Sequence, residues 1–170
     1  MAHPGKKLLF MGGEFGHFIE WNFDDSLDWH LVEGYPKHQE MQRYSKALNK
    51  FYNDQPAFWQ VDFDWRGFEW IDCSDMDHSI LVFVRRAKNG RDHVVVVSSF
   101  TPEVHYGYRI GVPESGTYLE VFNSDDTQYG GSGVTTGSPH QTEKIPWHNK
   151  PQSITLTIPP LATVYLKMKT

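Results

Sequence analysis

The sequence predicts a mainly β protein, in which an antiparallel β-sandwich at residues 57–170 follows one strand–loop–helix (βα) unit at residues 1–56. In the second part, short runs of apolar residues alternate with polar ones, which is typical of strands with one buried face. Turns rich in Gly and Pro separate these runs. The first part contains one apolar run and one long amphipathic pattern, so it supplies a single βα unit. We therefore expect two domains with a boundary at residue 56.

The first expected element is a buried strand at residues 8–11. Four apolar residues follow one another there without alternation, as in strands that are covered on both faces in a parallel sheet. Gly12 and Gly13 end the strand and place Glu14 at its C-terminal end. Chemistry in (β/α)8 barrels takes place at such strand ends. The unit is interpreted as the last strand, loop and helix of a barrel whose other strands lie outside this chain.

A loop and a helix complete this unit. The loop, residues 15–35, is long and rich in aromatic and acidic residues, a composition that argues against disorder. Pro36 suits the first turn of the helix, and the pattern ends at Asn53-Asp54, just before Pro56. The apolar face of the helix consists of Met41, Tyr44, Leu48, Phe51 and Tyr52.

The remaining sequence reads as short strands. Residues 80–84 and 94–97 are β-rich runs joined through Asn89-Gly90, a strong hairpin signal. A long Gly- and Ser-rich connection occupies residues 123–139. Seven or eight strands with such turns indicate an antiparallel sandwich. The other expected strands are 68–71, 108–112, 118–121, 154–158 and 164–168.

Composition and spacing exclude several classes of function. Sixteen basic and 21 acidic residues are spread along the chain, so we expect no nucleic-acid partner. The apolar runs are too short to span a bilayer, and we expect no membrane partner. A single cysteine, Cys73, excludes an internal disulfide and indicates the cytoplasm. No pair of histidines has metal-binding spacing, and Glu14 with His17 is too weak a signal for zinc, so we expect no metal and no cofactor.

Several long motifs carry a resemblance to a known family. The sequence resembles the C-terminal part of bacterial 1,4-α-glucan (glycogen) branching enzymes, which are α-amylase-type glycoside enzymes. The likeness covers essentially the whole chain, from the end of the catalytic barrel through the C-terminal all-β domain. The motifs are KKLLFMGGEFG (6–16), EWNFDDSLDWHL (20–31), GFEWIDCSD (67–75), ILVFVRR (80–86), SSFTP (98–102), YGGSG (129–133) and IPPLATVYL (158–166).

The resemblance implies an activity for a longer parent protein. Such enzymes cut an α-1,4-glucan chain and rejoin the piece through an α-1,6 link, forming branches in glycogen biosynthesis. The mechanism is retaining and requires two carboxyl groups roughly 5–5.5 Å apart. In the family these groups lie on earlier barrel strands, whose motifs are absent from this sequence. We therefore expect no catalytic residue here and an inactive fragment, whose partners are α-glucan (glycogen or amylose-like chains) and the missing N-terminal barrel.

The resemblance also implies residues that contact substrate. Gly12 and Glu14 match the family's glycine-x-glutamate turn beside the cleft, although Gly13 stands where well-known relatives carry asparagine. Glu14 therefore either supports the cleft or has a purely structural role. An acid–base pair of Glu14 with the acids of the following loop is not expected.

Four further residues are candidates for binding glucan. Trp21, Asp28 and Trp29 fall at the rim of the cleft, where the two indoles either stack on glucose units or anchor the loop. Trp70 shares one face of its strand with Phe68, and is either a core residue or a glucan platform. The alternatives to a bracing role are a free-standing carbohydrate-binding or interaction module, and a small oligomer that uses the surface of the βα unit.

Overall fold

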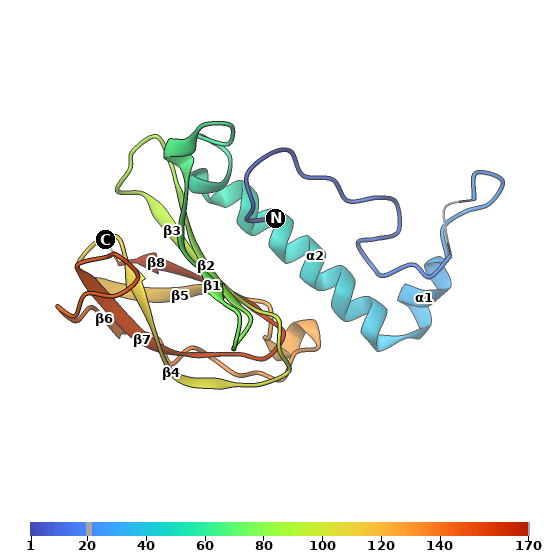
Figure 1. Ribbon diagram of the computed structural model, residues 1–170. Coiled ribbons are helices and arrows are strands. Elements are labelled where there is room, and N and C mark those ends of the chain that lie inside the picture. Colours follow the sequence, from blue (N-terminus) through green and yellow to red (C-terminus); the bar gives the residue numbers. More distant parts are fainter. Residues whose placement is uncertain (20–21, 170) are drawn as a thin grey trace.

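The computed structural model describes residues 1–19 and 22–169 of the chain (Figure 1). Two α-helices, α1 (Trp29–Gly34) and α2 (Pro36–Asp54), precede the strands. Short 3-10 helices follow at η1 (Pro56–Phe58), η2 (Trp65–Gly67) and η3 (Thr127–Tyr129). The strands are β1 (Phe68–Asp75), β2 (Ile80–Arg86), β3 (His93–Ser99), β4 (His105–Val112), β5 (Thr117–Asn123), β6 (His140–Gln141), β7 (Gln152–Ile158) and β8 (Thr163–Met168).

These strands form two antiparallel sheets. The larger sheet has six strands in the order β1-β2-β3-β8-β5-β6, and the smaller one pairs β4 with β7. Within the larger sheet, Val84 pairs with Val95 across β2 and β3, and Val96 pairs with Tyr165 across β3 and β8. The predicted antiparallel sandwich is confirmed, including the β2–β3 hairpin.

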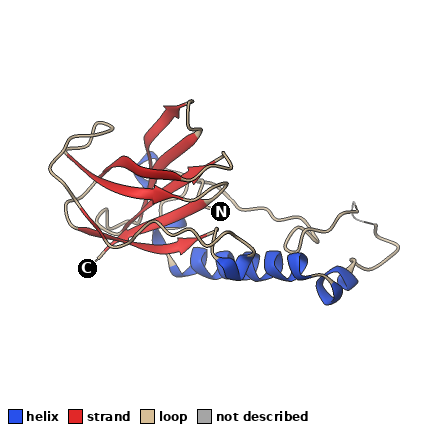
Figure 2. Ribbon diagram, turned by 90° about the horizontal axis from the view of Figure 1, so that it is seen from below, coloured by secondary structure: helices blue, strands red, loops and turns tan. Residues whose placement is uncertain are grey.

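Successive side chains of each strand point to opposite faces of the larger sheet, and both faces are buried. One face packs against the smaller sheet through aliphatic side chains such as Val82 and Val97 of the larger sheet and Ile110 and Ile154 of the smaller one. The other face is covered by α2 and η1. Figure 2 shows α2 lying along one side of the strands. The molecule therefore has three layers: α2, the larger sheet and the smaller sheet. The second core consists of Phe51, Phe58, Phe83, Val94, Val96 and Tyr165, with Ala2 and Ala57.

The predicted strand at residues 8–11 is wrong for this chain. No sheet in the described part includes these residues, and Leu8 is 90% exposed while its three successors are at least half exposed. A strand that is buried in a parallel sheet needs neighbours on both edges. A further strand would have to pair with an edge of the larger sheet, and the described edge strands β1 and β6 pair only with β2 and β5. The segment instead runs beside α2 as an extended loop (Figure 1).

The other boundaries follow the sequence closely. Helix α2 begins at Pro36 and ends at Asp54, as predicted. The loop expected at residues 15–35 contains the six-residue helix α1, which sequence reasoning missed. The two-residue strand β6 (His140–Gln141) was missed as well. None of the helices among the described residues is long and apolar enough to cross a membrane.

Candidate functional site

The first part of the candidate site is the turn that follows residues 8–11. Gly12 has φ of +83°, and its carbonyl accepts from the N–H groups of Phe15 (3.2 Å) and His17 (2.9 Å). A Cβ at Gly12 would lie 2.6 Å from Cβ of His17, so both the backbone angle and the space require glycine here. Glu14 is half-buried in this turn, and its carboxylate enters no ion pair among the described residues.

Phe15 anchors the turn to both helices. Its side chain is fully buried, and its ring lies 5.2 Å from Trp29 at the start of α1 and 5.9 Å from His17. The Phe15 carbonyl is 2.7 Å from Nδ1 of His38 on α2. Trp29 keeps 46% of its surface exposed, so it both packs against Phe15 and presents an open ring.

Asp28 lies beside the same turn. Its backbone N–H donates to Nδ1 of His17 (3.4 Å), and its carboxylate is 3.7 Å from that nitrogen. The structure thus brings Asp28 and Trp29 to the Gly12–His17 turn through His17 and Phe15. Sequence reasoning weighed His17 only as a metal ligand and did not identify Phe15, because no periodic pattern marks either contact. Trp21 lies outside the described residues.

Trp70 forms a separate location on β1, the edge strand of the larger sheet. Its ring meets Phe68 (5.0 Å) and Phe83 (5.6 Å) edge-on, and 44% of its surface is exposed. Glu69 faces the opposite side, where it pairs with Lys150, so the alternation expected for this strand is confirmed. Trp70 is therefore a half-exposed ring held by two others, the geometry of a stacking platform.

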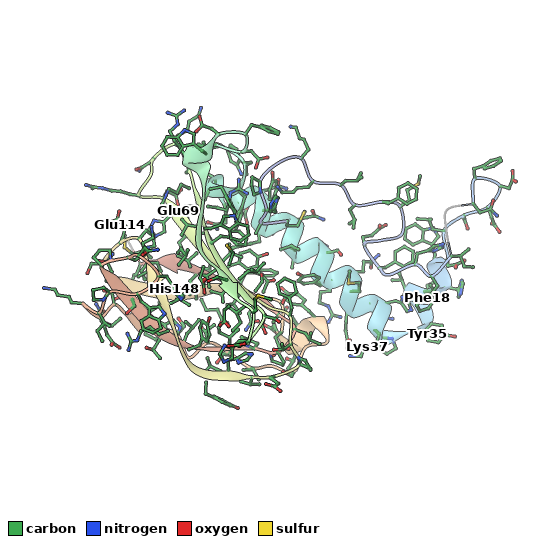
Figure 3. All side chains as sticks on the ribbon, in the orientation of Figure 1. Phe18, Tyr35, Lys37, Glu69, Glu114 and His148 are labelled. Atoms are coloured by element: carbon green, nitrogen blue, oxygen red, sulfur yellow. The ribbon has the colours of Figure 1, made fainter. Side chains whose placement is uncertain are left out.

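The two locations do not form one site. Figure 3 labels Glu69, the neighbour of Trp70, on the sandwich. Phe18 and Tyr35, which flank the loop that carries Asp28 and Trp29, lie at the far end of α2 (Figure 3).

The arrangement suits contact with a ligand better than covalent chemistry. Asp24 and Asp25 are exposed, and Asp28 faces His17, so the loop offers hydrogen-bonding groups beside an open ring. No group of three His, Cys, Asp or Glu side chains in the described part of the chain could hold a metal ion.

Residues 70–169 match the family described as alpha amylase, C-terminal all-beta domain, and the chain belongs to this family. Over 98% of its length the chain is 53% identical to the 1,4-alpha-glucan branching enzyme GlgB of Halothermothrix orenii and 52% identical to that of Rubrobacter xylanophilus. It thus corresponds to a C-terminal part of GlgB branching enzymes, and the resemblance seen in its motifs is confirmed.

The match covers only part of those relatives. The chain spans 26% of the Halothermothrix protein and 23% of the Rubrobacter protein, about a quarter of each. Among solved structures, an alpha-amylase from H. orenii aligns over 84% of this chain and 23% of its own, with a TM-score of 0.49 and 17% identity.

Proposed function

We propose that this chain is the C-terminal portion of a glycogen branching enzyme, which transfers α-1,4-glucan segments to form α-1,6 branches. The observation that carries the proposal is 53% identity over 98% of the chain to a branching enzyme of which it spans 26%. In this proposal residues 1–56 complete the catalytic barrel and residues 57–170 form the β domain. The reacting carboxylates belong to the barrel strands outside this chain, and the single cysteine supports a cytoplasmic location.

The exposed apolar side chains at the N-terminal end support a bracing role toward the barrel. Leu8, Leu9, Phe18 and Ile19 each expose half or more of their surface. Large apolar side chains that stay exposed favour contact with other protein, because burial of apolar surface contributes about 25 cal/mol per Å². In this proposal the barrel buries these side chains, and the long helix α2 connects them to the sandwich.

The substrate-contacting role proposed here belongs to two groups of residues. Glu14, Trp21, Asp28 and Trp29 would lie at the rim of the cleft, where the Gly12–His17 turn fixes Asp28 and Trp29. Trp70 would hold a glucan chain farther away, by stacking a glucose ring on its exposed face.

A chimera tests the proposal. The corresponding quarter of the Halothermothrix enzyme is replaced by this chain, and new α-1,6 links in amylose are measured by NMR. We expect branching by the chimera and none by the 170-residue chain alone. The matched control carries Leu8→Asp and Leu9→Asp, which should abolish branching by detaching the chain from the barrel. A folded chimera without activity, or branching by the isolated chain, would overturn the proposal.

The alternative is a free-standing carbohydrate-binding module. It is favoured by a sandwich core that is closed without residues 1–56 and by the half-exposed ring of Trp70. Titration with maltoheptaose, followed by tryptophan fluorescence, separates the two functions when combined with the chimera. Saturable binding that Trp70→Ala abolishes, together with an inactive chimera, would favour the module.

A further inference from the structure

A hollow opens at the edge of the sandwich, where β1 meets the smaller sheet. Its volume is about 830 Å³, within the range of small-molecule sites. The residues that line it come from the end of β1, from β4 and from the turn at 147–150. The lining includes Asp72, Asp75, Tyr106, Tyr108, Trp147 and His148.

This hollow lies on the side of the molecule that stays open. Strand β4 belongs to the smaller sheet, which covers the face of the larger sheet opposite α2. None of the described residues that line the hollow belongs to residues 1–19 or 22–56. In Figure 3, His148 lies within the sandwich, far from Phe18 and Tyr35 at the exposed apolar end. A partner that covers that end therefore leaves the hollow accessible.

Two aromatic rings from different elements stand at the rim. Tyr106 on β4 is 80% exposed, and Trp147 in the turn before β7 is 45% exposed. Exposed aromatic side chains with a polar handle provide a flat apolar surface next to water. Such a surface suits the C–H face of a sugar ring, which also carries hydroxyl groups at its edge.

Fixed polar groups lie beside the rings. The Asp75 carboxylate accepts from Oη of Tyr108 (2.6 Å) and from N–H of His78 (3.0 Å). Nε2 of His148 lies 3.4 Å from the Asp72 carboxylate. Nδ1 of His78 also lies 3.0 and 2.9 Å from the two oxygens of Asp75, so that carboxylate is fully engaged. These contacts hold both carboxylates in place, and Oδ2 of Asp72 keeps a lone pair for a hydroxyl donor. Polar groups that are already oriented bind a ligand with a smaller loss of entropy.

The turn that carries Trp147 is a tight two-residue hairpin with left-handed backbone angles. Trp147 and Lys150 exchange backbone hydrogen bonds (3.0 and 2.9 Å), and between them His148 and Asn149 have φ of +47° and +59°. These angles suit a two-residue hairpin, and after Gly they are adopted most readily by Asn, Asp and His. Gly111 makes the close approach possible, since a Cβ there would lie 2.2 Å from the Trp147 carbonyl oxygen. The surrounding structure thus fixes Trp147 at the rim.

We propose that this hollow is a second α-glucan-binding subsite, in which glucose units stack on Trp147 and Tyr106 and donate hydrogen bonds to the carboxylate of Asp72. The choice of sugar rests on the proposed function. Arg109 supplies the permanent positive charge among the described residues of the lining, and its Nη2 lies 2.9 Å from the carboxylate of Glu143. Because this charge is already paired, the hollow suits a neutral polyol better than an anion. It differs from the Trp70 platform, which lies on the face of β1 that packs with Phe83.

The test is a titration of the full 170-residue chain with maltoheptaose, followed by calorimetry. Trp147→Ala and Tyr106→Ala should each weaken binding about 3- to 10-fold, the range expected for loss of one aromatic contact. Trp65→Ala is the matched control, because this ring is 84% exposed but lies outside the hollow, and it should leave affinity unchanged. Because the Tyr106 side chain is exposed, Tyr106→Ala should fold normally. It therefore tests the subsite even if Trp147→Ala fails to fold.

The outcomes separate this inference from the proposed function. Unchanged affinity in a folded Tyr106→Ala, or absence of binding by the unaltered chain, would overturn the subsite. Loss of binding in Trp70→Ala alone would also overturn it and would leave the branching-enzyme proposal standing. An inactive chimera combined with weaker binding by Tyr106→Ala would overturn the branching proposal and support the subsite.

Discussion

Nη2 of Arg85 lies 2.9 Å from the carboxylate of Asp62, and the Arg85 side chain has no exposed surface. The same guanidinium donates to the backbone carbonyls of Ala2 (2.6 Å), Phe58 (3.0 Å) and Gly67 (3.1 Å). One charged side chain on β2 therefore ties the N-terminal residues and both 3-10 helices η1 and η2 to the outer face of the larger sheet. A buried charge of this kind is tolerated because each nitrogen of the guanidinium donates to a carbonyl or carboxylate oxygen.

We predict that Asp62→Ala lowers the free energy of unfolding by about 3 kcal/mol, because it leaves the buried charge of Arg85 without its carboxylate partner. The measurement is equilibrium unfolding in urea. The control is Asp54→Asn, which removes the exposed pair with Lys50 on α2 and should cost less than about 0.5 kcal/mol. Equal losses in the two variants would contradict a special role for the buried pair.

A second prediction concerns the packing of α2 on the sheet. Phe51 is buried and stacks on Phe122 at 5.0 Å, with Tyr165 at 5.1 Å. Phe51→Ala should cost about 3 to 4 kcal/mol, since it leaves a cavity among aromatic rings. Hydrogen exchange should then show faster exchange in α2 than in β3. Met41→Ala, on an exposed part of the same helix, should change neither quantity appreciably.

The third prediction is a loss of stability below neutral pH. His93 is buried between Tyr118 Oη (3.0 Å) and the Arg91 carbonyl (2.9 Å), and burial lowers its pKa. The unfolded chain binds the proton more readily, so stability is fully present above about pH 6.5 and is lost as pH falls toward the lowered pKa. Burial lowers the pKa of His140 and His148 in the same direction.

The measured free energy of unfolding should therefore stay level between pH 7.5 and about pH 6.5 and decrease steadily from there to pH 5. His93→Gln removes one titrating group and should give a shallower slope, whereas His78→Gln, at an exposed position, serves as the matched control. An identical slope in wild type and His93→Gln would exclude the buried imidazole as a source of the pH dependence.

Local pattern decided which elements the sequence could predict. The helical spacing of apolar residues and the flanking prolines fixed α2, and period-two alternation fixed the strands. The strand predicted at residues 8–11 failed because strand formation depends on neighbouring strands, and none of the described strands pairs with these residues. Helix α1 was missed because its six residues are too few for a periodic signal and no side chain caps it.

For the candidate site too, the sequence identified individual residues but not the tertiary contacts between them. Asp28 and Trp29 were identified by resemblance, but their contacts with His17 and Phe15 arise only when the loop folds back on the turn. The hollow at β4 joins Tyr106 to Trp147, which lies some forty residues farther along the chain, so only tertiary structure brings them together. Arg85 lies two residues after Phe83 on β2, so both side chains point to the same buried face of the sheet. A charged residue on a face that is otherwise apolar was the sequence signal for a buried ion pair.

The last prediction concerns the connection at residues 124–139. The Asp125 carboxylate is nearly buried and accepts from N–H (2.8 Å) and Oγ (2.6 Å) of Ser132 and from N–H of Val134 (2.9 Å). Asp125→Asn keeps the shape but replaces one acceptor oxygen by a donor, so it should cost about 2 kcal/mol. Limited proteolysis should then cut near Gly131 sooner, because the loop loses its internal anchor. Thr135→Ala, at an exposed position of the same loop, should be cleaved as slowly as wild type, and equally fast cleavage of both variants would rule out Asp125 as the anchor.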